Sequence, residues 1–231
     1  MILADIVPWG RSLDEYRLMF ALSEDDLRGR MLGCGDGPAS FNCELTARGG
    51  TVVSVDPLYA FAAAAIAQRV HETYDTIVGQ VRQNAQRYAW EYFADPDALG
   101  RARLAAMERF LADYAAGRAV GRYRTGSLPQ LDFADGAFDL ALCSHLLFLY
   151  SEQLSLEFHI AALAELLRVA QEVRVFPLLG LDCRVSPHLA PASAALAARG
   201  FVVEQVMVPY EFQRGGDHML RLRRPNDAMQ L

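Results

Sequence analysis

A glycine-dense turn between two apolar stretches is the feature that most constrains this chain. Residues 31–41 read MLGCGDGPASF, with a glycine at every second position from 33 to 37. The apolar spacing that follows predicts a helix, which Gly49 and Gly50 would end. The β-branched run TVVSV at 51–55 predicts a strand that leads to Asp56. Strand, turn, helix and strand form a βαβ unit, and such a unit builds a parallel sheet.

Residues 60–120 interrupt the α/β alternation, which resumes after residue 120. Residues 60–120 show helical patterns at 60–72, 74–93 and 96–116 and no clear strand. Around that insertion we expect helices at 12–29, 151–170 and 189–199, strands at 122–125, 138–145 and 172–179, and a hairpin at 201–224. The predicted fold class is α/β, with a doubly wound, mostly parallel seven-stranded sheet and an antiparallel C-terminal hairpin strand. We expect a single domain over 1–231 that carries a helical insertion at 60–120.

Composition excludes several kinds of chemistry. The chain has 231 residues, a net charge of −6 and 52% hydrophobic residues. It therefore has a large core and lacks the basic footprint of a nucleic-acid binder. Every basic residue is arginine. The absence of lysine excludes a Schiff-base lysine, a P-loop lysine and the Tyr-Lys pair of a short-chain dehydrogenase.

The cysteine spacing and the apolar runs indicate whether the chain binds a metal and in which cellular compartment it is expected. The four cysteines have no CxxC spacing, so we expect reduced thiols and no metal site. Residues 1–12 lack a basic start and a long apolar run, which argues against a signal peptide. The apolar run at 140–150 is too short to cross a bilayer. We expect a cytoplasmic protein with no membrane or nucleic-acid partner.

The glycine turn and Asp56 together suggest a nucleoside-containing ligand. Glycines allow backbone N–H groups to approach a ligand closely, and a carboxylate after the next strand can accept hydrogen bonds from ribose hydroxyls. A dinucleotide fingerprint needs Gly or Ala three residues after its second glycine. That position is Ser40 when the pattern starts at Gly35 and Pro38 when it starts at Gly33. Neither starting position therefore matches the dinucleotide-binding fingerprint.

The turn instead resembles the GxGxG motif of class I S-adenosylmethionine-dependent methyltransferases. The run FADGAFD at 133–139 resembles the family's approach to its fourth strand, and the terminal hairpin resembles its last two strands. The resemblance covers about residues 30–60 and 120–224 and is to uncharacterised bacterial members. In this family the position of Gly33 is commonly Asp or Glu, and Asp36 is the candidate replacement. Ser127 likewise stands where the family often has an acidic residue.

The resemblance also implies a set of site residues. Cofactor-binding positions would be Gly33, Cys34, Gly35, Asp36 and Gly37 in the turn, Asp56, Pro57 and Leu58 for ribose and adenine, Ser127 and Leu128 at the adenine edge, Ser144 near the methyl donor, and Arg11 and Tyr16 over the methionine end. His145 would be the catalytic base, because imidazole can take a proton near neutral pH.

The implied reaction is methyl transfer from S-adenosylmethionine to an oxygen or nitrogen nucleophile of a small molecule, with residues 60–120 as a substrate lid. Two alternatives remain open. The first is a nicotinamide-dependent oxidoreductase, and the second is a non-catalytic protein that binds S-adenosylmethionine. The sequence leaves the oligomeric state and the acceptor open.

Overall fold

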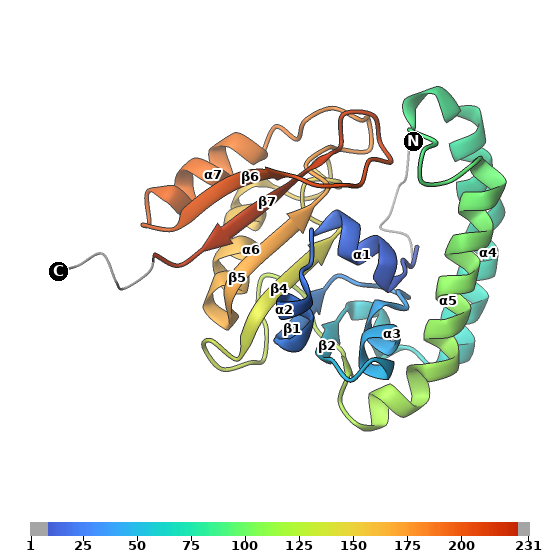
Figure 1. Ribbon diagram of the computed structural model, residues 1–231, viewed down its shortest axis with the longest axis horizontal. Helices are drawn as coiled ribbons and strands as arrows, with labels where there is room; N and C mark the ends of the chain where they lie inside the picture. The colour runs from blue at the N-terminus through green and yellow to red at the C-terminus, as the bar shows by residue number, and fades with distance from the viewer. Residues whose placement is uncertain (1–8, 226–231) are drawn as a thin grey trace.

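The computed structural model describes residues 9–225, and its centre is one seven-stranded sheet (Figure 1). The strand order is β3-β2-β1-β4-β5-β7-β6. Strand pairs are parallel except where β7 meets β5 and β6. The strands are β1 (Arg30–Cys34), β2 (Thr51–Val55), β3 (Tyr123–Arg124), β4 (Phe138–Ser144), β5 (Ala170–Phe176), β6 (Val202–Met207) and β7 (His218–Arg223). The predicted fold class is confirmed.

Helices cover both faces of this sheet because its central strands are apolar on both sides. On one face, Leu32, Ala141 and Val173 pack beneath α6 (Leu156–Val169) and α7 (Leu189–Ala197). On the other, Met31 and Leu142 pack against α1 (Leu13–Met19) and α3 (Phe41–Ala47). The short helix α2 (Glu24–Arg28) precedes β1 and is capped by Ser23. Adjacent residues of β1 therefore enter different cores, as period-two alternation requires.

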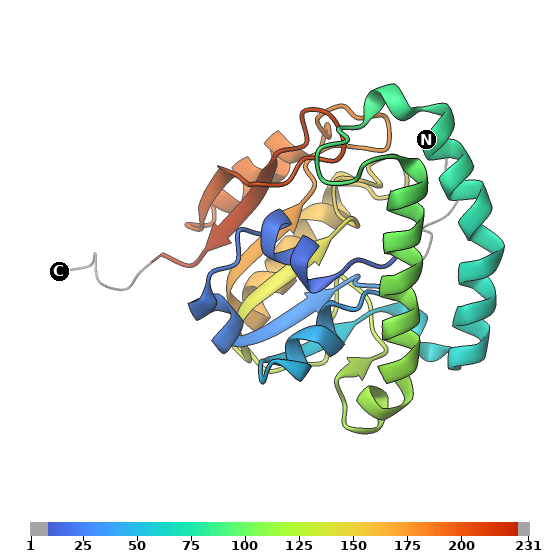
Figure 2. The ribbon, with the colours of Figure 1, turned by 45° about the vertical axis from the view of Figure 1, so that its right-hand side comes forward.

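The insertion consists mainly of two long helices that lie side by side beyond the β3 edge (Figure 2). They are α4 (Ala63–Gln83) and α5 (Pro96–Ala119), and short 3₁₀ turns occupy Pro57–Ala60 and Ala85–Arg87. The prediction of separate helices at 60–72 and 74–93 was wrong. No glycine or proline interrupts the chain between 63 and 78, so α4 continues through that region. After Asn84 the chain is no longer α-helical.

The segment 84–93 leaves the helix because it docks on the hairpin loop 208–217. The Ala89 N–H donates to the Phe212 carbonyl at 2.8 Å, and Tyr88 and Gln213 form an antiparallel bridge. The rings of Tyr88 and Phe212 stack with centroids 4.6 Å apart. The distal end of the insertion is thereby joined to the C-terminal hairpin.

Other boundaries differ from the expectations by a few residues. Helix α6 starts at Leu156 because Ser155 caps it, whereas 151–154 is a turn. The helix expected after the glycine turn, α3, begins at Phe41, three residues after Pro38. Residues 1–8, on which the signal-peptide prediction partly depends, lie outside the described residues. In the described part of the chain, no helix is long and apolar enough to cross a membrane.

Candidate functional site

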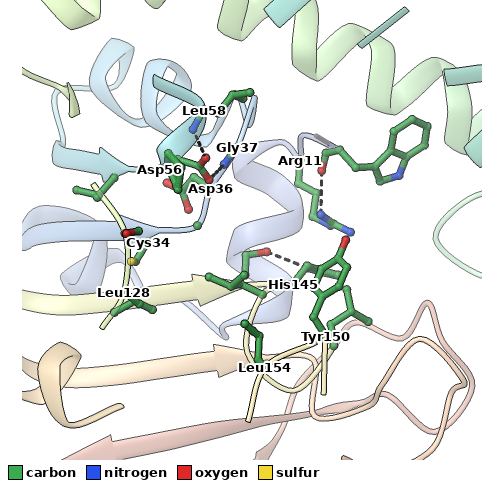
Figure 3. A pocket seen from close by; sticks show the side chains of 18 of the residues that line it. Arg11, Cys34, Asp36, Gly37, Asp56, Leu58, Leu128, His145, Tyr150 and Leu154 are labelled. Atoms are coloured by element: carbon green, nitrogen blue, oxygen red, sulfur yellow. Dashed lines mark hydrogen bonds between the residues drawn. The ribbon is translucent and has the colours of Figure 1, made fainter. Parts of the chain in front are cut away.

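A cavity of about 460 Å³ lies at the carboxyl ends of β1, β2 and β4, and it brings most of the predicted site residues together (Figure 3). Ligands in open α/β sheets bind at this edge. The predicted residues that line it are Arg11, Tyr16, Cys34, Gly35, Asp36, Gly37, Asp56, Pro57, Leu58, Ser127, Leu128, Ser144 and His145. Gly33 is the exception, because it does not line the cavity.

The turn after β1 has the backbone conformation that its glycines predict. Gly35 has φ +74° and Gly37 has φ +54°, values that favour glycine. The Gly35 N–H donates to the Val55 carbonyl at 2.9 Å, and the Tyr59 hydroxyl donates to the Gly37 carbonyl at 2.8 Å. These bonds hold the turn against the end of β2.

Asp56 connects the end of β2 to the glycine turn. Its Oδ2 accepts from the Gly37 N–H at 2.8 Å, and its Oδ1 accepts from the Leu58 N–H at 2.8 Å. Burial raises the pKa of this carboxyl, and the two N–H donors partly offset that effect. A carboxylate has about four acceptor positions. Two of them are filled here, so Asp56 keeps acceptor capacity for a ligand in the cavity.

Asp36 takes the space that a side chain at position 33 would fill. A Cβ atom at Gly33 would lie 1.8 Å from Asp36 Oδ2. Buried donors reach both carboxylate oxygens, from the Tyr16 hydroxyl at 2.7 Å and the Ser54 hydroxyl at 2.6 Å. Burial raises the pKa of Asp36 to about 6, against the opposing effect of the two hydroxyl donors. The structure thus puts an acid beside β1 although the strand itself carries a glycine there.

Arg11 contributes positive charge to the cavity. It donates to the Trp9 carbonyl at 2.9 Å, whereas its Nε is buried without a hydrogen-bond partner. Burial and the nearby charge of Arg103 lower the pKa of Arg11 to about 10, so the side chain remains cationic at neutral pH. A buried, incompletely paired guanidinium at a cavity wall suits an anionic ligand group.

Behind Arg11 lies an ion pair between Glu15 and Arg103, which joins α1 to α5. Both side chains are at most 3% exposed, and Tyr210 also donates to Glu15 Oε1 at 3.1 Å. Burial alone would raise the pKa of Glu15, but the charge and hydrogen bonding of Arg103 outweigh it and lower the pKa. Arg103 therefore neutralises Glu15, and the positive charge of Arg11 remains in excess.

His145 follows β4 with φ +56°, a conformation that non-glycine residues rarely adopt. Strain of this kind costs on the order of 1–3 kcal/mol and is concentrated at functional sites. The imidazole Nδ1 lies 2.9 Å from the Ser144 hydroxyl. The backbone N–H of His145 donates to the Phe176 carbonyl at 2.7 Å. Burial, with Arg11 and Arg103, lowers the pKa of His145 well below its usual value. The imidazole is therefore neutral at pH 7.

The sequence reasoning missed an apolar wall. It comes from α4, the segments that follow β4 and β5, α6 and the two docked loops. Its members are Ile77, Val81, Tyr88, Leu149, Leu154, Phe158, Leu181 and Phe212. Aromatic residues of the insertion were expected mainly to pack, with a minority facing a ligand. Phe110 and Tyr114 do pack in a buried cluster, and Tyr88 faces the cavity. The wall depends on the pairing of two loops that are far apart in the sequence, and no local sequence pattern indicates such a pairing.

Among residues 9–225, no three His, Cys, Asp or Glu side chains group in a way that could hold a metal ion. Figure 3 shows Asp56 and Leu58 on one side of the cavity and Arg11, His145 and Tyr150 on the other. The site can hold an elongated ligand with a hydroxylated end and a charged end.

Solved structures with a similar arrangement include magnesium protoporphyrin IX methyltransferase from Synechocystis with bound SAM. That protein is 16% identical, with 92% of this chain and 78% of that chain covered and a TM-score of 0.45. A TehB-like SAM-dependent methyltransferase from Corynebacterium glutamicum is 14% identical, with coverages of 96% and 89% and a TM-score of 0.47. At such identities and TM-scores these likenesses carry no argument about the ligand or the reaction.

No protein-family model matches the sequence. The uncharacterized protein MJ0045 of Methanocaldococcus jannaschii is 31% identical over 223 residues, which cover 96% of this chain and 98% of that protein. This relative is archaeal, so the expected likeness to bacterial proteins stays a prediction. The chain belongs to the same family as this archaeal protein.

Proposed function

We propose that the cavity binds S-adenosylmethionine and that the protein transfers the methyl group to an oxygen or nitrogen nucleophile of a small molecule. One observation carries the proposal. The Asp56 carboxylate holds the Gly37 N–H of a GxGxG turn while keeping acceptor positions at the cavity. This geometry is the one that the sequence resemblance to class I methyltransferases implies.

The chemistry of the lining residues fits the parts of this cofactor. Asp56 has acceptor capacity for the ribose hydroxyls, and the apolar side chains of Leu58 and Leu128 suit the faces of adenine. Asp36 offers a carboxylate beside Asp56, and Arg11 offers a guanidinium across the cavity. Two opposite charges of this kind suit the ammonium and carboxylate groups of an amino acid.

The protein's own part in the reaction is alignment and proton removal. The sulfonium group of S-adenosylmethionine supplies an already activated methyl group. The cavity walls would orient the acceptor for in-line attack, a contribution that can reach several kcal/mol. His145 would take the proton of the acceptor, because its imidazole is neutral and lines the cavity.

The remaining expectations are part of the same proposal. The acceptor is a small molecule, reached beneath the lid formed by residues 60–120, and no nucleic acid or membrane takes part. The contacts of 84–93 with the hairpin loop support a role for the insertion as a lid. The net charge of −6 supports the exclusion of nucleic acid.

Calorimetric titration with S-adenosylmethionine, its demethylated product and NAD tests this function. We expect dissociation constants on the order of micromolar for the first two and no binding of NAD. Preference for NAD would instead support the oxidoreductase alternative. Tight binding without methylation of any acceptor in a broad screen would favour the non-catalytic alternative.

A further inference from the structure

The half of the cavity around His145 differs in character from the half around Asp56. Apolar side chains line the cavity from four parts of the chain, namely α4, α6 with the segment that leads into it, and the paired loops 84–93 and 208–217. The wall includes Ile77, Val81, Tyr88, Leu154, Phe158 and Phe212.

This wall is held in place without a ligand. The Ala89 N–H to Phe212 carbonyl bond and the stacked rings of Tyr88 and Phe212 connect its two loops. Ile77 and Val81 are at most 2% exposed and belong to one buried cluster with Tyr88. A preformed apolar cavity favours apolar ligands, since burial of apolar surface contributes about 25 cal/mol per Å².

Charge near His145 is unfavourable for a cationic acceptor. Among the described residues that line the cavity, the carboxylates are Asp36 and Asp56. Figure 3 shows both of them together, on the side of the cavity opposite His145. The charges that act on His145 are those of Arg11 and Arg103. An ammonium group here would lose its hydration and meet positive charge.

An anionic acceptor would compete for the one cationic side chain among the described residues that line the cavity. That cation is Arg11, which the proposed function assigns to the carboxylate of the cofactor. With Arg11 so engaged, a second carboxylate beside the apolar wall would be buried without a partner, at a cost of several kcal/mol.

We infer that the acceptor is an uncharged aromatic molecule whose ring lies against this apolar wall and whose hydroxyl group is presented to His145. The inference rests on the proposed function and names its substrate class. The hydroxyl oxygen forms a bond to the methyl carbon as the carbon–sulfur bond breaks, and the hydroxyl proton passes to the imidazole. The products are an aryl methyl ether, a neutral thioether and protonated His145. An aromatic hydroxyl suits this step because its pKa, about 10 in tyrosine, is far below that of water.

Three probes that share one ring system but differ in charge test whether the acceptor is neutral, anionic or cationic. They are 2-naphthol, 2-naphthoate and 2-naphthylmethylamine, titrated into the protein saturated with S-adenosylhomocysteine. We expect 2-naphthol to bind at least about tenfold more tightly than either charged probe, a difference of about 1.4 kcal/mol. Tighter or equal binding of the carboxylate or the amine, or no binding of any probe, overturns the inference.

Two variants localise the binding. Leu154→Asn places an amide in the apolar wall at a partly buried position and should weaken 2-naphthol binding about fivefold or more. Glu152→Asn, on the exposed surface two residues away, is the matched control and should leave it unchanged. Equal effects of the two variants would contradict the proposed location.

Turnover supplies a second readout. With S-adenosylmethionine present, we expect 2-methoxynaphthalene to form, and His145→Gln to lower its rate at least about 100-fold while S-adenosylhomocysteine still binds. Failure of S-adenosylhomocysteine to bind the wild type would refute the proposed function itself. Its binding together with a preference for a charged probe would refute the acceptor class alone.

Discussion

The carboxylate of Asp36 lies where a side chain at Gly33 would have to be. A Cβ at position 33 would be 1.8 Å from Asp36 Oδ2 and 2.5 Å from its Cγ. Heavy atoms do not approach this closely, so the glycine at 33 and the acid at 36 depend on each other. The acidic side chain beside the end of β1 therefore belongs to a residue of the turn and not to a residue of the strand.

Gly33→Ala should therefore disturb the site. The new methyl group would displace the Asp36 carboxylate from its donors Tyr16 and Ser54. We expect a loss of about 1–3 kcal/mol in the free energy of unfolding, as for overpacking, and at least about tenfold weaker S-adenosylmethionine binding. Urea denaturation and calorimetry measure the two effects.

Gly79→Ala is the matched control for that substitution. Gly79 lies within α4, and a Cβ there would meet no atom within 4 Å. Alanine should raise stability by up to about 1 kcal/mol through helix propensity. If both variants behave alike, the dependence of Gly33 on Asp36 is refuted.

Asp36 should make stability depend on pH. Its pKa is about 6 in the folded protein, above the ordinary value of 3.8 for an aspartate, so the folded state holds the proton more tightly. The resulting stabilisation is fully present below pH 3.8 and is lost as the pH rises through 6. By linkage the change is on the order of 3 kcal/mol.

Asp36→Asn isolates this contribution, because the amide cannot ionise. The unfolding free energy of Asp36→Asn minus that of the wild type should rise between pH 4 and pH 7. Urea denaturation across that range measures it, with both proteins in the same buffers. A difference that stays constant with pH would show that the carboxyl of Asp36 titrates normally.

Removing only one partner of the Glu15–Arg103 ion pair should greatly lower the free energy of unfolding. Arg103→Met leaves the Glu15 carboxylate buried without its cation, and we expect a loss of about 3–5 kcal/mol. The double variant Glu15→Gln/Arg103→Met should be more stable than Arg103→Met alone. Urea denaturation at pH 7 measures both.

An exposed pair supplies the control for this experiment. Arg82 and Asp97 form an ion pair in which both side chains are about 60% exposed. Arg82→Met should cost less than about 1 kcal/mol. Similar losses for Arg82→Met and Arg103→Met would mean that burial does not set the strength of the Glu15–Arg103 interaction.

Arg11→Gln should affect only ligands that carry a carboxylate. We expect S-adenosylhomocysteine to bind roughly 10–100-fold more weakly, since a hydrogen bond to a charged group contributes about 1.5–3 kcal/mol. 5′-Methylthioadenosine, which lacks the amino-acid portion, should bind both proteins within about twofold. Parallel losses for the two ligands would exclude a specific contact between Arg11 and the carboxylate.

The sheet and the Asp56 end of the cavity could be predicted from sequence because their signals are local. The run of β-branched residues at 51–55 marks β2, and the acid that follows it sits at the strand end by necessity. The glycines at 35 and 37 mark the turn, and their positive φ angles agree with this. In each case neighbours in the chain determine the conformation.

The other half of the site depends on contacts that no local pattern encodes. The Glu15–Arg103 pair joins residues 88 positions apart. The apolar wall exists because 84–93 leaves its helical pattern to pair with Phe212 and Gln213. The family resemblance implied that Gly33 contacts the cofactor. The position of Asp36 shows that Gly33 instead provides space for that carboxylate.

The central claim is that Asp56 and the glycine turn bind S-adenosylmethionine, and titration calorimetry on Asp56→Ala tests it most directly. The exposed Asp75→Ala on α4 is the control, and circular dichroism verifies that each variant is folded. We predict micromolar binding of S-adenosylmethionine to the wild type and to Asp75→Ala. Asp56→Ala should bind at least about tenfold more weakly, a loss of about 1.4 kcal/mol. Equal affinity of a folded Asp56→Ala, or no binding to the wild type, would contradict the account.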